Sequence, residues 1–129
     1  MKTAARITVA MTGASGAPYT LRLLEQLLAA GCQVQFICSG PGQVVMAMET
    51  ELKLADSPQK MQRQLRAHFA IDDERLVVYG RDQWTAPPAS GSSVADAMVI
   101  CPCSMGSLAA IAQGIGNNLI MTSAARWIR

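Results

Sequence analysis

The stretch ITVAMTGASGAPYTLRLLEQLLAAG, residues 7–31, decides the fold because it joins a strand to a helix through a turn of small residues. The apolar run from Ile7 to Met11 stops at Thr12 and Gly13. Leucines at three- and four-residue spacing then predict a helix that begins near Ala17. Backbone N–H groups at a helix start are unpaired, and the helix dipole favours negative charge there. The turn TGASGA is therefore a candidate cradle for a phosphate or a flat ring, which small residues allow to approach the backbone closely.

The turn alone does not name its ligand. Gly13 and Gly16 are not part of a G-x-G-x-x-G dinucleotide fingerprint, and no Gly-Lys-Ser/Thr follows as in a nucleoside-triphosphate loop. A tight strand-to-helix turn that merely packs is the alternative on this stretch, and the rest of the chain has to decide.

The bulk composition is that of an apolar single domain. The chain has 129 residues, of which 50% are hydrophobic and 16% charged, with a net charge of +2. This composition favours buried parallel strands or a large subunit interface. No apolar run reaches the roughly 20 residues of a membrane span. No signal-peptide pattern precedes the first strand, and no basic stripe carries interleaved aromatics. We expect a cytoplasmic protein without nucleic-acid partners.

The cysteines do not suggest a metal site or a redox motif. Cys101 and Cys103 lie two apart, which is not the C-x-x-C spacing, and His68 is the only histidine. We expect no metal, and the default interpretation of Cys32, Cys38, Cys101 and Cys103 is buried free thiols in a reducing compartment.

The order of the expected elements predicts the fold. Gly31 is expected to close the first helix, and RDQWTAPPASGSS (81–93) to form an irregular loop. The other expected elements are a strand at Gln33–Cys38, helices at Gly42–Leu52 and 58–70, strands at 74–80 and 95–102, and a helix at 104–115 with Ser104 as N-cap. This order indicates an α/β fold of the Rossmann or flavodoxin-like kind, a three-layer sandwich with a parallel sheet in a single domain, 1–129.

Four segments should converge where such sheets bind ligands, beyond the C-terminal ends of the strands. They are TGASGA (12–17), CSGPG (38–42), APPASGSS (86–93) and CPCSMGS (101–107). All are rich in serine, glycine and alanine and nearly free of charge. Hydroxyls and backbone amides suit a neutral ring that carries a phosphate.

At this point the residues resemble the UbiX-type flavin prenyltransferases, formerly described as aromatic-acid decarboxylases. The segments that carry the resemblance are ITVAMTGASGAPYTLRLL, MAMETEL, WTAPPASGSS and MVICPCSMGSLAAIAQGIGNNLI. The resemblance implies FMN as cofactor and transfer of a dimethylallyl group from dimethylallyl phosphate to N5 and C6 of reduced FMN. It also implies a homo-oligomer, expected to be a dodecamer, and a partner decarboxylase that uses the prenylated FMN.

The resemblance also implies the site residues. Gly13, Ala14 and Ser15 are similar to the first flavin-binding turn, Ser39 to a second contact, and Ser104, Met105, Gly106 and Ser107 to a third. Catalytic roles are implied for Ser15, near N5, and for Glu49, in the family's ETE position. Trp84, Ala89, Ser90 and Gly91 resemble the wall and floor of the prenyl pocket. From the residues alone, a solvated helix carboxylate beside Glu51 is the favoured interpretation of Glu49, and an anchor for a loop or subunit contact is an alternative for Trp84.

The tail MTSAARWIR, residues 121–129, departs from the family pattern. The family continues from NNLI into an acidic-Arg-Ala-Ala-Asp segment, a further strand and a set of charged residues that hold the substrate phosphate. We therefore expect a truncated or aberrant tail.

Three other functions stay open. One is a non-catalytic FMN-binding or assembly fragment, and another is a flavoprotein that decarboxylates a peptidyl cysteine. A nicotinamide-dependent dehydrogenase lacks both the glycine fingerprint and an acidic residue after the second strand.

Overall fold

Four parallel strands form the centre of the molecule. The structure, a computed structural model, describes residues 4–83, 95–114 and 118–125. The strands are β1 (Arg6–Met11), β2 (Gln33–Cys38), β3 (Leu76–Tyr79) and β4 (Ala97–Ile100). They lie in the order β3-β2-β1-β4, so the chain builds outward from β1 on one side and then returns to pair β4 with its other edge. The expected α/β fold with a parallel sheet is confirmed.

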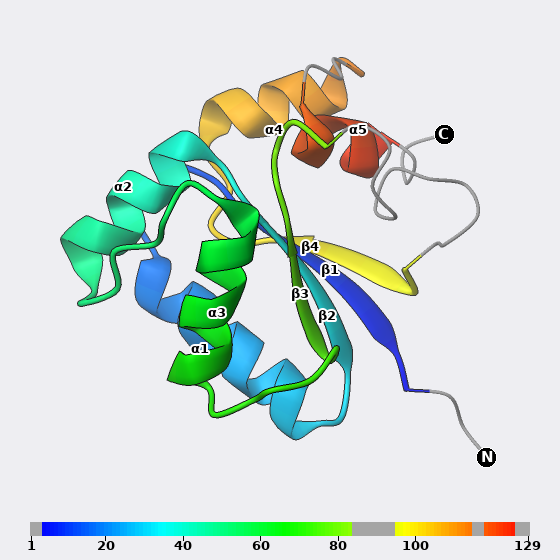
Figure 1. Ribbon diagram of the computed structural model, residues 1–129. Helices are drawn as coiled ribbons and strands as arrows, with labels where there is room; N and C mark the ends of the chain where they lie inside the picture. The colour runs from blue at the N-terminus through cyan, green and yellow to red at the C-terminus, as the bar shows by residue number, and fades with distance from the viewer. Residues whose placement is uncertain (1–3, 84–94, 115–117, 126–129) are drawn as a thin grey trace.

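Helices cover both faces of the sheet, as a three-layer sandwich requires (Figure 1). The helices are α1 (Ala17–Ala29), α2 (Gly40–Glu49), α3 (Pro58–His68), α4 (Met105–Ala112) and α5 (Leu119–Ala125). The first three pack on one face, where Leu24, Met46 and Leu65 join Val9 and Phe36 in the main core. On the other face, α5 packs against the sheet in a smaller cluster.

Alternation along the strands assigns residues to the two faces. Val9 and Met11 belong to the main core, whereas Ala10 packs with Ile37 and with Leu119 of α5. Successive side chains of a strand point to opposite faces, and both faces are covered here. This explains why the strands are mainly apolar in sequence, and the buried polar pair in them, Thr8 and Gln35, is hydrogen-bonded.

Helix ends differ from the expected ones where side chains compete for the backbone. Helix α2 begins at Gly40, because Ser39 caps it by accepting from the Gly42 N–H at 3.0 Å. It ends at Glu49, not Leu52, because Thr50 adopts an extended conformation and its hydroxyl accepts from the Leu52 N–H. Helix α3 ends at His68, two residues early, and Ala70 follows at a φ of 55°.

The tail of the chain contributes a helix that the sequence analysis does not predict. Leu119 and Ile120 of α5 are buried, and the Leu119 N–H donates to the Arg81 carbonyl at 2.7 Å. In the described ranges, no helix combines the length and apolar character that crossing a bilayer requires.

Candidate functional site

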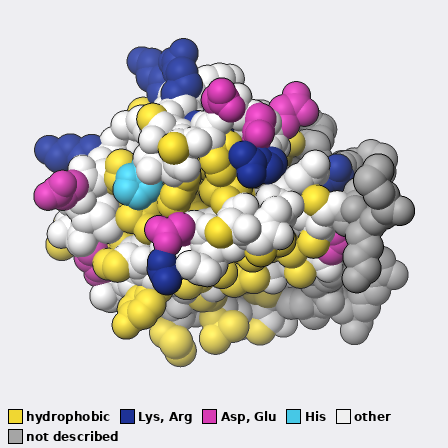
Figure 2. Space-filling view, turned by 90° about the horizontal axis from the view of Figure 1, so that it is seen from below, with side chains coloured by type: hydrophobic (Ala, Val, Ile, Leu, Met, Phe, Trp, Pro, Cys, Tyr) yellow, Lys and Arg dark blue, Asp and Glu magenta, His cyan; other side chains and the backbone are white. Residues whose placement is uncertain are grey.

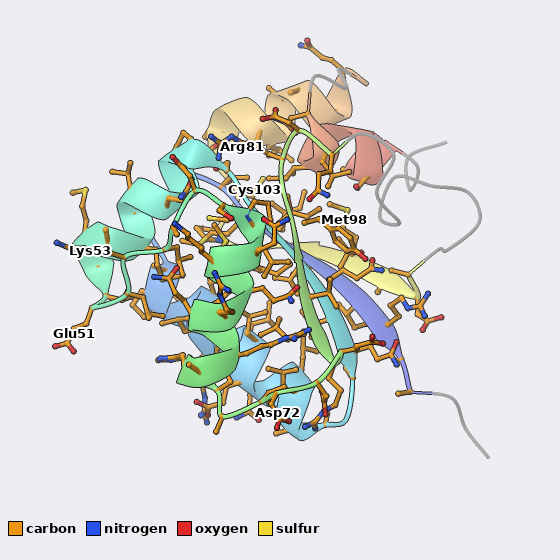
Figure 3. The ribbon with its side chains drawn as sticks, viewed as in Figure 1. Glu51, Lys53, Asp72, Arg81, Met98 and Cys103 are labelled. Carbon is orange, nitrogen blue, oxygen red and sulfur yellow. The ribbon has the colours of Figure 1, made fainter. Side chains whose placement is uncertain are left out.

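The strand order places a topological switch point at the C-terminal edge of the sheet. The chain leaves β1 for β2 and β3 on one side, while β4 lies on the other, so the connections after β1 and β4 diverge. Ligands of open α/β sheets bind at such a switch point. The turn after β1 (13–16) and the loop after β4 (101–104) meet here, as the sequence predicted. Figure 3 shows Cys103 and Arg81 at this end of the sheet and Asp72 at the opposite end.

The first turn is shaped by two glycines with different tasks. A Cβ on Gly13 would lie 2.3 Å from the Pro41 Cβ, so the absence of a side chain lets the turns after β1 and β2 pack together. Gly16 has a φ of 132°, which L side chains rarely adopt. The expectation that both glycines make room for a ligand is therefore incomplete, because Gly13 makes room for Pro41. Ala14 stands between them, half-buried.

Glu49 closes this turn from the end of α2. Its carboxylate accepts from the Ser15 hydroxyl at 2.8 Å and from the N–H groups of Gly16 and Ala17, each at 2.9 Å. The two backbone bonds and the Ser15 bond hold the pKa of Glu49 below its ordinary value. The structure thus brings the two predicted catalytic residues together, and the N-terminus of α1 already has its anion, the Glu49 side chain.

The N-terminus of α4 is the second part of the site. Ser104 caps the helix by accepting from the Ser107 N–H at 3.1 Å, and the two hydroxyls are 2.8 Å apart. Helix geometry leaves the first N–H groups, of Met105 and Gly106, without intrahelical acceptors. Within the part of the chain that the structure describes, no atom lies within 4 Å of a Cβ built on Gly106, so those residues leave space there.

Ser39 lies at the start of α2, beside the first turn. Its N–H donates to the Met11 carbonyl at 3.0 Å, and its hydroxyl is used in capping α2. The structure therefore gives Ser39 a clear structural task, and a flavin contact stays a prediction. The four residues predicted for the prenyl pocket, Trp84, Ala89, Ser90 and Gly91, lie outside the described residues.

A cavity of about 400 Å³ adjoins the end of β3, and Cys38, Met61 and Arg81 are among its lining residues. Burial raises the pKa of the Cys38 thiol to about 12, so the side chain is a neutral thiol at physiological pH. The Arg81 guanidinium donates to Gln43 Oε1 at 3.1 Å. Cys38 is thus a buried core thiol, as expected, whereas Cys32, Cys101 and Cys103 are free thiols that are only partly buried.

Two threonines that the sequence analysis does not single out join the two turns. The Thr12 hydroxyl donates to the Pro102 carbonyl and accepts from the Ser104 N–H, both at 2.8 Å. The Thr20 hydroxyl donates to the Cys101 carbonyl at 2.7 Å. All three partners are more than 80 residues away in the chain, so no local pattern could have revealed them.

Known proteins resemble this chain over nearly all of its length. Flavin prenyltransferase UbiX of Pseudomonas aeruginosa is 51% identical over 119 residues, which are 92% of this chain and 57% of the relative. Flavin prenyltransferase UbiX of Halalkalibacterium halodurans is 38% identical over 117 residues, or 91% of this chain and 55% of the relative. The chain thus spans little more than half the length of these curated relatives.

Solved structures share the fold. One is the crystal structure of AnUbiX in complex with FMN and dimethylallyl pyrophosphate, with a TM-score of 0.78 and 32% identity over 95% of this chain and 58% of that chain. Another is a dodecameric FMN-dependent UbiX-like decarboxylase from Escherichia coli O157:H7, with a TM-score of 0.76 and 27% identity over 93% of this chain and 58% of that one. The model of the Flavoprotein family matches residues 1–129. The chain belongs to the Flavoprotein family.

Proposed function

We propose that this chain is the FMN-binding part of a flavin prenyltransferase, which transfers a dimethylallyl group from dimethylallyl phosphate to reduced FMN. The observation that carries the proposal is the Ser15–Glu49 hydrogen bond beside the open N-terminus of α4. The relatives named flavin prenyltransferase support it, as does the solved neighbour that holds FMN and dimethylallyl pyrophosphate.

The residues present fit FMN. A phosphate needs unpaired donors, and the first turn of α4 offers the N–H groups of Met105 and Gly106 with open space at Gly106. The N-terminus of α1 is a poor second choice, because Glu49 already accepts from two of its N–H groups. We therefore assign the phosphate to α4 and the flavin ring to the crevice in front of Ser15.

The chemistry that bound reduced FMN supplies is a nucleophilic N5 and a C6 position that loses a proton after its new bond forms. Glu49 is ionised at neutral pH, because the ordinary pKa of a glutamate, 4.5, already lies below neutrality and its hydrogen bonds lower the pKa further. It accepts a hydrogen bond from the Ser15 hydroxyl, so the lone pairs of Ser15 Oγ are free to accept from a ligand. A proton can thus be taken at Ser15 Oγ while the hydroxyl proton moves to Glu49 Oε2, which is general-base chemistry by relay.

The oligomeric state of the protein is a further part of the proposal. Large apolar side chains are exposed near the site on α1, α2 and α4, namely Tyr19, Val44, Met48, Met105 and Leu108. They support a homo-oligomer, proposed to be a dodecamer like the solved UbiX-like neighbour. Sedimentation velocity should show a species well above 13.7 kDa, and a monomer would contradict it.

A partner decarboxylase and a cytoplasmic location are also proposed, the latter because all four cysteines are free.

Mass spectrometry of the flavin, after incubation of the protein with reduced FMN and dimethylallyl phosphate, tests the activity. We expect a gain of one prenyl unit. Glu49→Gln and Ser15→Ala should slow the gain at least about tenfold while FMN affinity changes less. Glu51→Gln, an exposed neighbouring carboxylate, is the matched control and should behave like wild type.

Two outcomes would contradict parts of the proposal. Unchanged FMN that stays bound would favour the non-catalytic alternative, which the coverage of 57% of the relative keeps open. A protein that binds no FMN would overturn the whole proposal.

The peptidyl-cysteine decarboxylase alternative gains no support, because His68 ends α3 at the opposite end of the sheet. Figure 2 views the molecule from that end, where charges of both signs are scattered among apolar side chains.

A further inference from the structure

Thr12 connects the two halves of the candidate site through a single buried hydroxyl. Only 2% of Thr12 is exposed, and its Oγ1 both donates to the Pro102 carbonyl and accepts from the Ser104 N–H. The Thr12 N–H also donates to the Pro102 carbonyl, at 3.1 Å. Thr12 is the last residue before the first turn, and Ser104 is the N-cap of α4.

Further contacts tie the same loop to α1. Thr20, fully buried, donates to the Cys101 carbonyl at 2.7 Å. A Cβ on Gly16 would lie 3.4 Å from the Pro102 Cβ, so the proline ring stands directly beside the first turn. The loop after β4 is therefore held to the β1–α1 unit at three of its residues, 101, 102 and 104.

We infer that Thr12 is a positioning residue of the flavin site, whose hydroxyl holds the N-terminus of α4 in register with the Ser15–Glu49 turn. The inference rests on the proposed function. One ligand that spans both turns needs their separation fixed before it binds, and a fixed separation lowers the ordering cost of binding.

The hydrogen bonds also indicate which contact would be lost if the Thr12 hydroxyl were removed. The Pro102 carbonyl would keep its bond from the Thr12 N–H, but the Ser104 N–H would lose its acceptor. An unsatisfied buried donor is costly, so Ser104 would shift to find another acceptor. That shift would move the α4 N–H groups that are proposed to hold the phosphate.

The test compares Thr12→Val, which keeps the shape and removes the hydroxyl, with Thr12→Ser, which restores it. The control is Thr8→Val in the same strand. Thr8 is equally buried, and its hydroxyl donates to Gln35 Oε1 at 3.0 Å, away from both turns. Each variant is titrated with FMN and with riboflavin by flavin fluorescence, and its melting temperature is recorded.

We expect Thr12→Val to raise the Kd of FMN about tenfold and to leave riboflavin nearly unaffected, with Thr12→Ser close to wild type. Thr8→Val should lower the melting temperature comparably without changing either affinity. Equal effects of Thr12→Val and Thr8→Val on FMN affinity would reduce Thr12 to a structural residue and overturn the inference.

A second variant keeps the test open if Thr12→Val does not fold. Thr20→Val removes one bond to the same loop and should raise the Kd of FMN about threefold. An unchanged Kd there would overturn the inference. Failure of the proposed function is distinguishable, because the wild-type protein itself would then bind no FMN.

Discussion

Glu49 shows how one exposed side chain links two helices at the residue scale. It belongs to the last turn of α2, yet three of its hydrogen bonds go to the start of α1. A carboxylate at a helix N-terminus is stabilised by the unpaired N–H groups and by the dipole. The same bonds orient Ser15, so the proposed catalytic pair also links α2 to the start of α1.

The hydrogen bonds of the Glu49 carboxylate predict that the stability of the fold depends on pH. The folded pKa of Glu49 lies below its ordinary value of 4.5, which we take for the unfolded chain. Its contribution is therefore fully present above about pH 4.5 and is lost as the pH falls through the lower folded pKa. Wild type should melt a few degrees above Glu49→Gln at neutral pH, and the two should converge in acid. A difference in melting temperature that stays constant from pH 7 to pH 3 would contradict this.

The residues also show what a sequence can and cannot predict. Ser15 and Glu49 were expected at one site, and they are hydrogen-bonded to each other. The reason for Gly13 was only partly predictable, because Pro41 reaches it through tertiary packing. The sequence gives no sign of the role of Thr12 at the end of the first strand. Its hydrogen-bond partners Pro102 and Ser104 come only after β4, far along the chain.

At the element scale, three helices begin at the same edge of the sheet, but their N-termini are not equivalent. Helix α1 is capped by Glu49 from a neighbouring helix, and α2 begins at Gly40 after its N-cap Ser39, with Pro41 in its first turn. Helix α4 is capped by its own Ser104 and leaves space at Gly106. These differences support the proposal that the phosphate binds at α4, although the sequence motif drew attention to α1.

Ser104→Ala tests this assignment against a matched cap. The substitution should cost about 1 kcal/mol of folding stability, as is usual for an N-cap, and should weaken FMN binding about fivefold. Ser57→Ala removes the equivalent cap of α3, away from the crevice, and should cost similar stability without changing the Kd of FMN. Denaturant unfolding and flavin titration of both variants decide the matter. If both variants bind FMN like wild type, the phosphate does not sit at α4.

Element boundaries were less predictable than element types. Strand β2 and the start of α1 were expected where they occur, because apolar periodicity and flanking glycines mark them. Helix α2 ends early through the competing Thr50 hydroxyl, which a periodic pattern does not register. Helix α5 was missed because its sequence departs from the family pattern, yet Leu119 and Ile120 are buried on the sheet.

At the scale of the whole molecule, alternating strands and helices were enough to predict a parallel sheet, but not its strand order. The order β3-β2-β1-β4 creates the switch point, where the loops after β1 and β4 are hydrogen-bonded to each other. The convergence of small, uncharged segments was predictable from their positions after strands. Their connection through Thr12 and Thr20 depends on the three-dimensional packing of loops far apart in sequence.

The central claim is that this crevice binds FMN with its phosphate at the N-terminus of α4. An equilibrium titration of the wild-type protein with FMN and, in parallel, with riboflavin tests it most directly, because the two ligands differ only in the phosphate. Charge-assisted hydrogen bonds to the phosphate should make FMN bind at least about tenfold more tightly than riboflavin. Equal affinities, or no binding of either flavin, would contradict the claim.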